Sequence, residues 1–490
     1  MTAPALTRRS ALLAGLASGV AGLSGRLPAA DGLSLSEALA AAVVAANAQP
    51  LPSDVAERTA WTLLDGLGAM VHGAAQPSVR RDIAPFVSRS GSPTASVVGH
   101  GRAVPAELAA AANAYLLHAE EVDDSDLLAQ LRASAVILPV ALAMAEALDV
   151  SGAAFLRAAA LGYTIQRRLA APLGPTQRFG WMASGVWGPP AASAMAASML
   201  GLPASGIAAA LALAGSASGG SFQYFYDQTE EKRLIVARGA RIAIESARLA
   251  ATGVAGARRI LEGTAGLYRL IGGEGATLPT ANALSAELGR REGPLFLHPK
   301  YYSASSSIIP MLDGLRADLP PTLRPEQITG FTVRGDAGWA RVLAGKIDTF
   351  VPPDTRIGAM INFSYMVALF VSRRSALPRD LTAAALRDPA ILALAARGRF
   401  VTAPTREVTI DFALAGGGTC TATARTPPVD RPAPLDAARR MEKFDGLTTP
   451  VLGEARQSAL KAACLTVGQA RSMRGWASQL RRTSAQGGHS

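Results

Sequence analysis

Five carboxylates occur within seven positions of the stretch HAEEVDDSD, which spans residues 118 to 126 and is called the acidic loop below. An apolar, alanine-rich segment precedes this loop, and the apolar segment SAVILPVALAMAEAL follows it. Carboxylates that face cationic side chains in a cleft can take part in acid–base chemistry. Charge runs, however, often form a solvated turn between two helices. The local sequence leaves both interpretations open.

Composition limits the elements that can position this loop. The chain has 490 residues, of which 49% are hydrophobic, 17% charged and only 5% aromatic. Alanine and leucine must therefore supply most of the core, which favours closely packed helices. The formal net charge is +11, but Lys and Arg are spread along the chain rather than clustered with aromatic residues. This distribution argues against a nucleic-acid partner and would suit a small anionic substrate.

The N-terminus has the pattern of an export signal. TRRSALLAGLASGVAGL carries paired Arg8 and Arg9, followed by an uncharged run from Ser10 to Gly25. The run is short and rich in Gly and Ser for a spanning helix, which needs roughly 20 apolar residues. We expect residues 1–30 to be a twin-arginine signal, with a buried N-terminal helix as the alternative. The mature protein would then lie in a bacterial periplasm, without a membrane partner.

The pattern along the chain predicts a mainly α fold with a smaller α+β part. Residues 31–264 read as a large all-helical domain, residues 265–427 as an α+β domain, and residues 428–490 as a helical segment that completes the first domain. The two cysteines are far apart in unlike contexts, so neither a metal cluster nor a disulfide framework is indicated.

Apolar residues at spacings of three and four predict the individual helices. They are expected over residues 34–48, 54–74, 105–121, 134–148, 152–169, 189–202 and 232–252. Strands are expected over 327–335 and within 405–425, where the glycines at 416–418 separate two alternating runs and indicate a hairpin.

An ordered series of motifs resembles the MmgE/PrpD family, which contains 2-methylcitrate dehydratase and cis-aconitate decarboxylase. After the acidic loop come GYTIQRRL, GWMASGVWGPPAASAMAASMLGL, EEKRLIVARGARIA, LEGTAGL, HPKYYSASSS and FSYMVA. The resemblance covers roughly residues 35–450. It implies a homodimer whose active site lies between a helical domain and a lid-like α+β domain, without metal or organic cofactor. It further implies a di- or tricarboxylate substrate that loses water or CO₂ or shifts a proton.

Within the acidic loop the resemblance is close but uneven. Asp123 and Asp124 match the family's two aspartates directly. Glu121 stands where the family has its first Asp, and Ser125 replaces a Thr and keeps the hydroxyl. The resemblance therefore implies catalytic roles for Glu121, Asp123 and Asp124, and a substrate-binding role for Ser125.

Outside the loop, two lysines and a tyrosine match. Lys232 and Lys300 correspond to carboxylate-binding lysines, and Tyr365 to a tyrosine that would donate a proton. Arg132 stands in place of a family His; it cannot act as a base near neutral pH but can bind a carboxylate in a bidentate manner. Ser184 lies where the family has a His-Pro-Thr-Gly motif and is expected to bind substrate.

Around four of the family's histidines are replaced here, which argues against the parent reaction, since histidine is best suited to proton transfer near neutral pH. Met182 and Ile235 occupy two of these positions. Of the remaining histidines, only His118 and His298 lie within the motifs. We expect His298 to be the better catalytic candidate and His118 to make a structural hydrogen bond.

Two functional hypotheses remain. The first is a lyase, a dehydratase or decarboxylase, or else an isomerase, that acts on a small di- or tricarboxylate by cofactor-free acid–base chemistry. The second is a catalytically silent extracytoplasmic member of the family that binds a carboxylate ligand or a protein partner. The surviving lysines and tyrosine favour the first, and the missing histidines favour the second.

Overall fold

A computed structural model of the protein describes residues 32–88, 91–286, 288–336, 339, 350–405 and 407–481. The predicted twin-arginine signal lies outside the described residues. From Ser34 onward the described residues belong to one compact unit. None of the described helices is long and apolar enough to cross a membrane.

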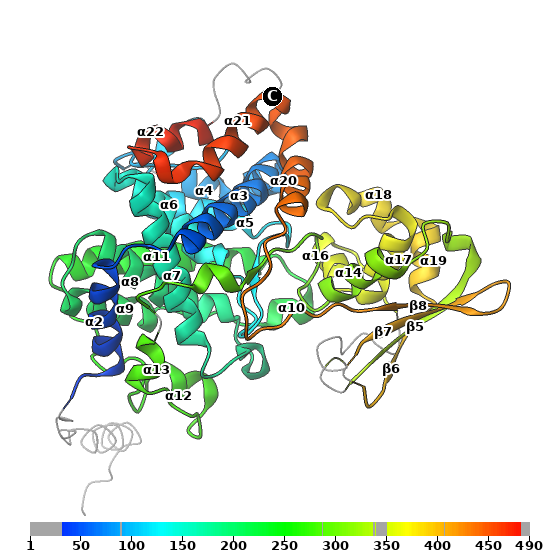
Figure 1. The fold of residues 1–490 in the computed structure, drawn as a ribbon, viewed down its shortest axis with the longest axis horizontal. Coiled ribbons are helices and arrows are strands. Elements are labelled where there is room, and N and C mark those ends of the chain that lie inside the picture. The colour runs from blue at the N-terminus through cyan, green and yellow to red at the C-terminus, as the bar shows by residue number, and fades with distance from the viewer. Residues whose placement is uncertain are drawn as a thin grey trace, which may run out of the picture. The chain divides into compact units, whose positions relative to one another are not determined.

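The first part of this unit is helical, as the sequence predicts (Figure 1). Its helices are α2 (Leu35–Asn47), α3 (Ser53–Ala75), α4 (Pro77–Val87), α5 (Ala106–Leu117), α6 (Ser134–Leu148), α7 (Gly152–Ala170), α8 (Ala183–Met199), α9 (Ala204–Ser216), α10 (Gln223–Asp227), α11 (Glu231–Ala251), α12 (Leu267–Gly272) and α13 (Ala281–Ser285). Helix α11 packs against α5, α8 and α9. Alanines at these contacts are fully buried, so the helices approach closely.

Two helix boundaries differ from the prediction for physical reasons. Helix α5 ends at Leu117, so the acidic loop is not part of it. Helix α8 begins at Ala183 rather than at Pro189, although Pro189 lacks the N–H that would bond to the carbonyl of Gly185. The Gly219 N–H donates to that carbonyl instead, at 3.0 Å. A contact from a distant loop therefore compensates for the proline.

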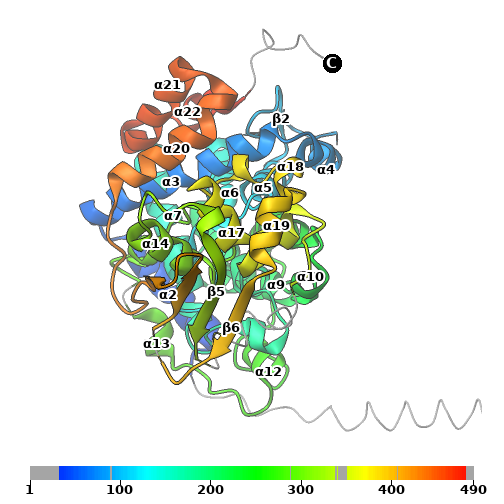
Figure 2. The ribbon, with the colours of Figure 1, turned by 90° about the vertical axis from the view of Figure 1, so that its right-hand side faces the viewer.

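The smaller part consists of a mixed sheet with helices on one face (Figures 1 and 2). Its elements are α14 (Ile309–Asp318), β5 (Ile328–Gly335), α16 (Arg356–Met360), α17 (Phe363–Arg373), α18 (Ala383–Leu386), α19 (Pro389–Ala395), β6 (Gly398–Thr402), β7 (Thr409–Leu414) and β8 (Thr419–Thr423). The strand order is β6-β5-β7-β8, with β5 and β6 parallel and the other pairs antiparallel. The predicted hairpin is confirmed, since Gly417 and Gly418 adopt positive φ at its turn.

The C-terminal helices α20 (Ala437–Leu452) and α21 (Glu454–Leu465) return to the helical part, where both pack against α3; α22 (Met473–Ala477) follows and packs against α6. Phe444, Leu460 and Cys464 join the same hydrophobic core as the first helices. A second core lies in the α+β part. The mainly α fold with a smaller α+β part is thus confirmed, whereas the domain boundaries at residues 264 and 427 stay predictions.

Two short antiparallel pairs complete the fold. Strands β1 (Ala95–Ser96) and β2 (Ala103–Val104) pair with each other. Strand β3 (Ser125–Asp126) belongs to the acidic loop and pairs with β4 (Leu297–His298). Because Lys300 follows β4 by two residues, this pairing holds the segment that carries Lys300 against the acidic loop.

The close approach of α14 to β8 gives a test of the α+β packing. A Cβ at Gly314 would lie 2.2 Å from the carbonyl oxygen of Thr423, so Gly314→Ala must displace the backbone. We expect it to lower the free energy of unfolding by about 1–3 kcal/mol, measured by urea denaturation. Gly446→Ala in α20 is the control, because a Cβ there would lie 3.7 Å from the Arg379 side chain, an ordinary van der Waals distance. Equal stability of both variants would contradict the packing described here.

Candidate active site

The acidic loop is buried, so its interpretation as a solvated turn is wrong. Its five carboxylate side chains belong to residues that are between 0% and 7% exposed. Burial of an ionised carboxylate is costly unless a cation or hydrogen-bond donors compensate for it. Each carboxylate has such a partner, and the partners come from different elements of the fold.

Glu121 lies between two buried lysines. Its Oε1 accepts a hydrogen bond from the Nζ of Lys232 on α11, and its Oε2 accepts one from the Nζ of Lys300 at 2.6 Å. Burial by itself would raise the pKa of Glu121, but the two ammonium groups outweigh it and hold the pKa well below its usual range. The backbone of Glu121 is left-handed, with φ of +53°, which is strained for a non-glycine residue. The loop therefore presents this carboxylate to both lysines at a conformational cost.

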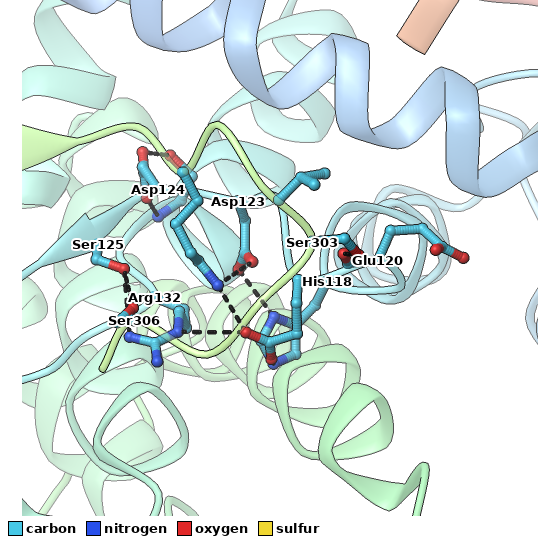
Figure 3. A network of polar contacts seen from close by, with 12 residues as sticks. His118, Glu120, Asp123, Asp124, Ser125, Arg132, Ser303 and Ser306 are labelled. Atoms are coloured by element: carbon cyan, nitrogen blue, oxygen red, sulfur yellow. Dashed lines mark hydrogen bonds and ion pairs between the residues drawn. The ribbon is translucent and has the colours of Figure 1, made fainter. Parts of the chain in front are cut away.

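His118 and Asp123 form a second pair beside Glu121 (Figure 3). The His118 Nδ1 lies 2.8 Å from the Asp123 Oδ2. Burial lowers the pKa of His118, which favours the neutral ring. Although burial opposes the shift, His118 and Lys300 lower the pKa of Asp123 to about 2, so this carboxylate is ionised. We infer that Nδ1 carries the ring proton and donates a hydrogen bond to Asp123, which leaves a lone pair on Nε2.

The Nε2 of His118 makes no hydrogen bond to any residue that the structure describes, and it lies 3.9 Å from the Glu121 Oε1. A buried imidazole nitrogen without a partner is uncommon and needs an explanation. Since His118 lines the cavity described below, a ligand can supply the missing partner.

Arg132 adds a third cation next to this cluster (Figure 3). Its Nε lies 3.9 Å from the Glu121 Oε2, and its Nη1 donates to the Ser125 hydroxyl at 3.3 Å. The hydroxyls of Ser125 and Ser306 are 2.7 Å apart. Ser184 accepts from the backbone N–H of Arg132 at 2.8 Å and so fixes the start of that segment. The predicted binding residues therefore lie together.

Asp124 points away from the cluster and caps a helix (Figure 3). It accepts from the backbone N–H of Ser134 at 2.9 Å and from the hydroxyl of Ser134 at 2.5 Å, at the start of α6. Burial raises the pKa of Asp124 to about 7, against the effect of the Ser134 hydrogen bonds. At this position Asp124 has a structural function, and it does not contact the cavity.

The remaining two carboxylates of the loop are also structural. Asp126 accepts from Arg167 Nη1 at 2.5 and 2.6 Å. Glu120 pairs with Arg356 of α16 and points away from His118 in Figure 3. These pairs tie the loop to α7 and to the α+β part.

A cavity of about 880 Å³ opens at the cluster, between the helical and the α+β parts. His118, Glu121, Arg132 and Lys232 line its polar end, and Ser305, Ser306 and Ser307 come from the α+β part. Among the described residues, no group of three or more His, Cys, Asp or Glu is placed to hold a metal ion. The arrangement can bind an anion and offer it an acid–base group.

Besides Asp124, two further predicted catalytic residues lie elsewhere. Tyr365 is fully buried in the core of the α+β part, its hydroxyl has no hydrogen bond to a described residue, and it does not line the cavity. His298 pairs through its backbone with Ser125 on β3 and does not line the cavity either. Burial and nearby arginines lower the pKa of His298 to about 4. The structure thus gives no contact that supports a catalytic role for Tyr365 or His298.

The sequence alone led us to underestimate His118 as a catalytic candidate. Of the four described histidines (His72, His100, His118 and His298), His118 alone lines the cavity. The signal was the spacing of five residues to Asp123, but a contact across a turn cannot be read from helix or strand periodicity. The four aromatic residues of the run FQYFY at 222–226 also line the cavity, although no sequence motif indicates it.

The pKa of Asp124 predicts a pH dependence of stability. Its folded-state pKa of about 7 exceeds the ordinary value of 3.8. The stabilisation from the bound proton is therefore present below about pH 4 and is lost as the pH rises through 7. Asp124→Asn keeps the cap without this titration, so the wild type should lose about 1–3 kcal/mol relative to the variant between about pH 5 and pH 8.

Urea denaturation at both pH values measures this difference. Asp54→Asn, which removes an exposed carboxyl group from the first turn of α3, is the control for the loss of one negative charge. If the wild type and Asp124→Asn differ by the same amount at both pH values, Asp124 does not hold a proton in the folded state.

The sequence of the chain is similar to that of proteins from one known family. Residues 37–278 match the MmgE/PrpD N-terminal domain, and residues 302–467 match the MmgE/PrpD C-terminal domain. Over 215 residues the chain is 29% identical to "Cis-aconitate decarboxylase-like protein oryM" of Aspergillus oryzae, which covers 42% of this chain and 44% of that protein. Over 171 residues it is 28% identical to "Cis-aconitate decarboxylase" of Aspergillus terreus, which covers 34% of this chain and 35% of that protein. The matched region thus spans less than half the length of these curated relatives. The two domain matches together cover most of the sequence, and the chain belongs to the MmgE/PrpD family.

Proposed function

We propose that this protein is a lyase that acts on a carboxylate substrate in the cavity, by acid–base chemistry of its own side chains. The observation that carries the proposal is the buried His118 ring beside three cations, with Nδ1 held by Asp123 and Nε2 without a hydrogen-bond partner among the described residues. The family and the two relatives named as cis-aconitate decarboxylases support lyase chemistry on a carboxylate.

His118 has the arrangement that proton transfer requires. The ionised Asp123 fixes the tautomer and the orientation of the ring and would stabilise the imidazolium that forms when Nε2 takes a proton. Because burial lowers the pKa of His118, the ring is available as a base near neutral pH. We assign to His118 the transfer of a proton to or from a carbon of the substrate.

The cations would hold the substrate and stabilise the charge that develops. Arg132 can bind a carboxylate through two parallel hydrogen bonds. When a carbon next to that carboxylate loses its proton, negative charge spreads onto the carboxylate oxygens, and fixed cations nearby lower the barrier. In an elimination, the electron pair then expels a leaving group from the next carbon. In a decarboxylation, the electron pair left by CO₂ would take its proton from the His118 imidazolium.

The second candidate function is a silent binding protein, and one observation favours it. Glu121 engages both Lys232 and Lys300, so the chain supplies its own carboxylate to two of the three cations. If that arrangement persists with ligand bound, the site binds an anion without turning it over.

His118→Gln discriminates the two functions. Glutamine can donate a hydrogen bond to Asp123 but cannot transfer a proton, so we expect kcat to fall by roughly 10²- to 10⁴-fold while the Kd for a carboxylate ligand changes little. Steady-state turnover and calorimetric titration measure the two quantities. The control is His72→Gln on α3, because His72 does not line the cavity. Turnover that survives in His118→Gln would remove His118 from the mechanism.

Export and assembly remain proposals from the sequence and the family resemblance. We propose that the twin-arginine signal directs the protein to the periplasm and that the mature protein is a homodimer. Intact mass of the protein from a periplasmic fraction would test cleavage near residue 30, and sedimentation would test the dimer. A full-length cytoplasmic product would contradict the first proposal, and a monomer at micromolar concentration the second.

A further inference from the structure

The cavity is much larger than the space that a carboxylate group at its polar end would fill. At about 880 Å³ it lies at the upper end of the range for pockets that hold drug-sized ligands. Away from the charged cluster much of the wall is apolar, and this part includes Leu127, Met182, Pro310, Ile357 and Ile361. An apolar surface of this size gains free energy when an apolar ligand covers it. The site thus offers an apolar volume next to the cationic cluster.

Aromatic side chains concentrate on one side of this volume. The whole chain has 13 Phe, 8 Tyr and 5 Trp. Four of these aromatic residues occur within the five positions from 222 to 226, and all four line the cavity: Phe222, Tyr224, Phe225 and Tyr226. Phe222 stacks on Phe225 with ring centroids 5.0 Å apart. Tyr226 is 61% exposed, which leaves an aromatic face free for a ligand.

The charges at the polar end limit the charge of the ligand. The cations of the cluster are Lys232, Lys300 and Arg132, and the carboxylates are Glu121 and Asp123. Three positive and two negative charges leave an excess of one positive charge, with His118 neutral. One carboxylate of a ligand balances that excess, since buried charges are favourable only when compensated.

Charges around the cluster do not change this sum. Glu120 and Asp126 are each bonded to an arginine outside the cavity wall. Among the residues that the structure describes, the two other charged residues that line the cavity, Arg178 and Asp336, have opposite signs. The described residues therefore offer a second or third carboxylate no matching positive charge in this cluster.

We propose that the substrate of this site carries one carboxylate group on a bulky apolar or aromatic body. The carboxylate binds at Arg132 and the apolar body lies against the aromatic residues 222–226. This proposal rests on the proposed function and departs from the di- or tricarboxylate that the family resemblance implies. The proposal follows from the net charge of the cluster together with the apolar part of the cavity. The sequence motifs reveal neither of the two.

A matched series of acids tests the proposal by calorimetric titration of the purified protein. Butanoate and 4-phenylbutanoate share one carboxylate and differ by a phenyl ring, whereas glutarate and citrate add carboxylates without adding an apolar body. We expect 4-phenylbutanoate to bind about tenfold or more tightly than butanoate, because the ring is buried against the aromatic wall. Glutarate and citrate should bind no more tightly than butanoate.

The outcomes separate this proposal from the proposed function. If glutarate or citrate binds more tightly than 4-phenylbutanoate, the proposal about the substrate is wrong and the carboxylate site stands. If none of the acids binds, the carboxylate site itself is wrong, and the proposed function falls with it.

Two variants test the two parts of the argument separately. Glu121→Gln raises the excess from one to two positive charges, so the affinity for glutarate should rise about tenfold relative to that for butanoate. Phe225→Ala should reduce the ratio between the affinities for 4-phenylbutanoate and butanoate about fivefold. Circular dichroism checks the fold of both variants. Unchanged ratios in a folded variant would overturn the corresponding part, and Phe225→Ala keeps the test decisive if Glu121→Gln does not fold.

Discussion

The Glu121 carboxylate between Lys232 and Lys300 is the interaction on which the arrangement of the site depends. It joins the acidic loop, helix α11 and the segment after β4, which are far apart in the sequence. All three groups are buried, so each has lost its hydration and none is favourable alone. Removal of one partner from such a buried set typically costs about 3–5 kcal/mol, because it leaves an uncompensated charge.

The same principle explains why a basic protein places five carboxylates between two buried helices. The acids of the loop meet partners from several elements of the fold. Glu120 reaches α16 through Arg356, Asp124 caps α6 at Ser134, and Asp126 reaches α7 through Arg167. The loop thereby connects the helical part to the α+β part, while Glu121 lines the polar end of the cavity and Asp123 holds His118, which also lines it. One short segment thus combines structural and chemical roles.

The chemistry of the site follows from the small number of charges that remain uncompensated there. Asp123 orients His118, and burial keeps the ring neutral, so the site has a base without a metal ligand set among the described residues. Arg132 replaces a family histidine and supplies charge instead of a second proton-transfer group. One proton-transfer residue beside one unbalanced positive charge would suit a single carboxylate, and the aromatic segment 222–226 provides the surface for the rest of the molecule.

The fold could largely be predicted from the sequence, because helix periodicity, the Ser34 cap and the glycines of the hairpin act locally. The prediction of secondary structure failed where contacts between distant residues determine it. The first turns of α8 depend on Gly219, and β6 forms by pairing with β5. Motif order placed Glu121, Lys232, Lys300 and Arg132 in one site.

The sequence alone could not show that the two lysines share one carboxylate or that His118 contacts Asp123 across the turn. Nor could it separate these groups from Tyr365, which lies in the core of the α+β part. Such facts depend on the burial and relative position of side chains far apart in the chain. Sequence determined which charged groups are present, and tertiary structure decided which of them remain unbalanced, because only burial makes each charge require a partner.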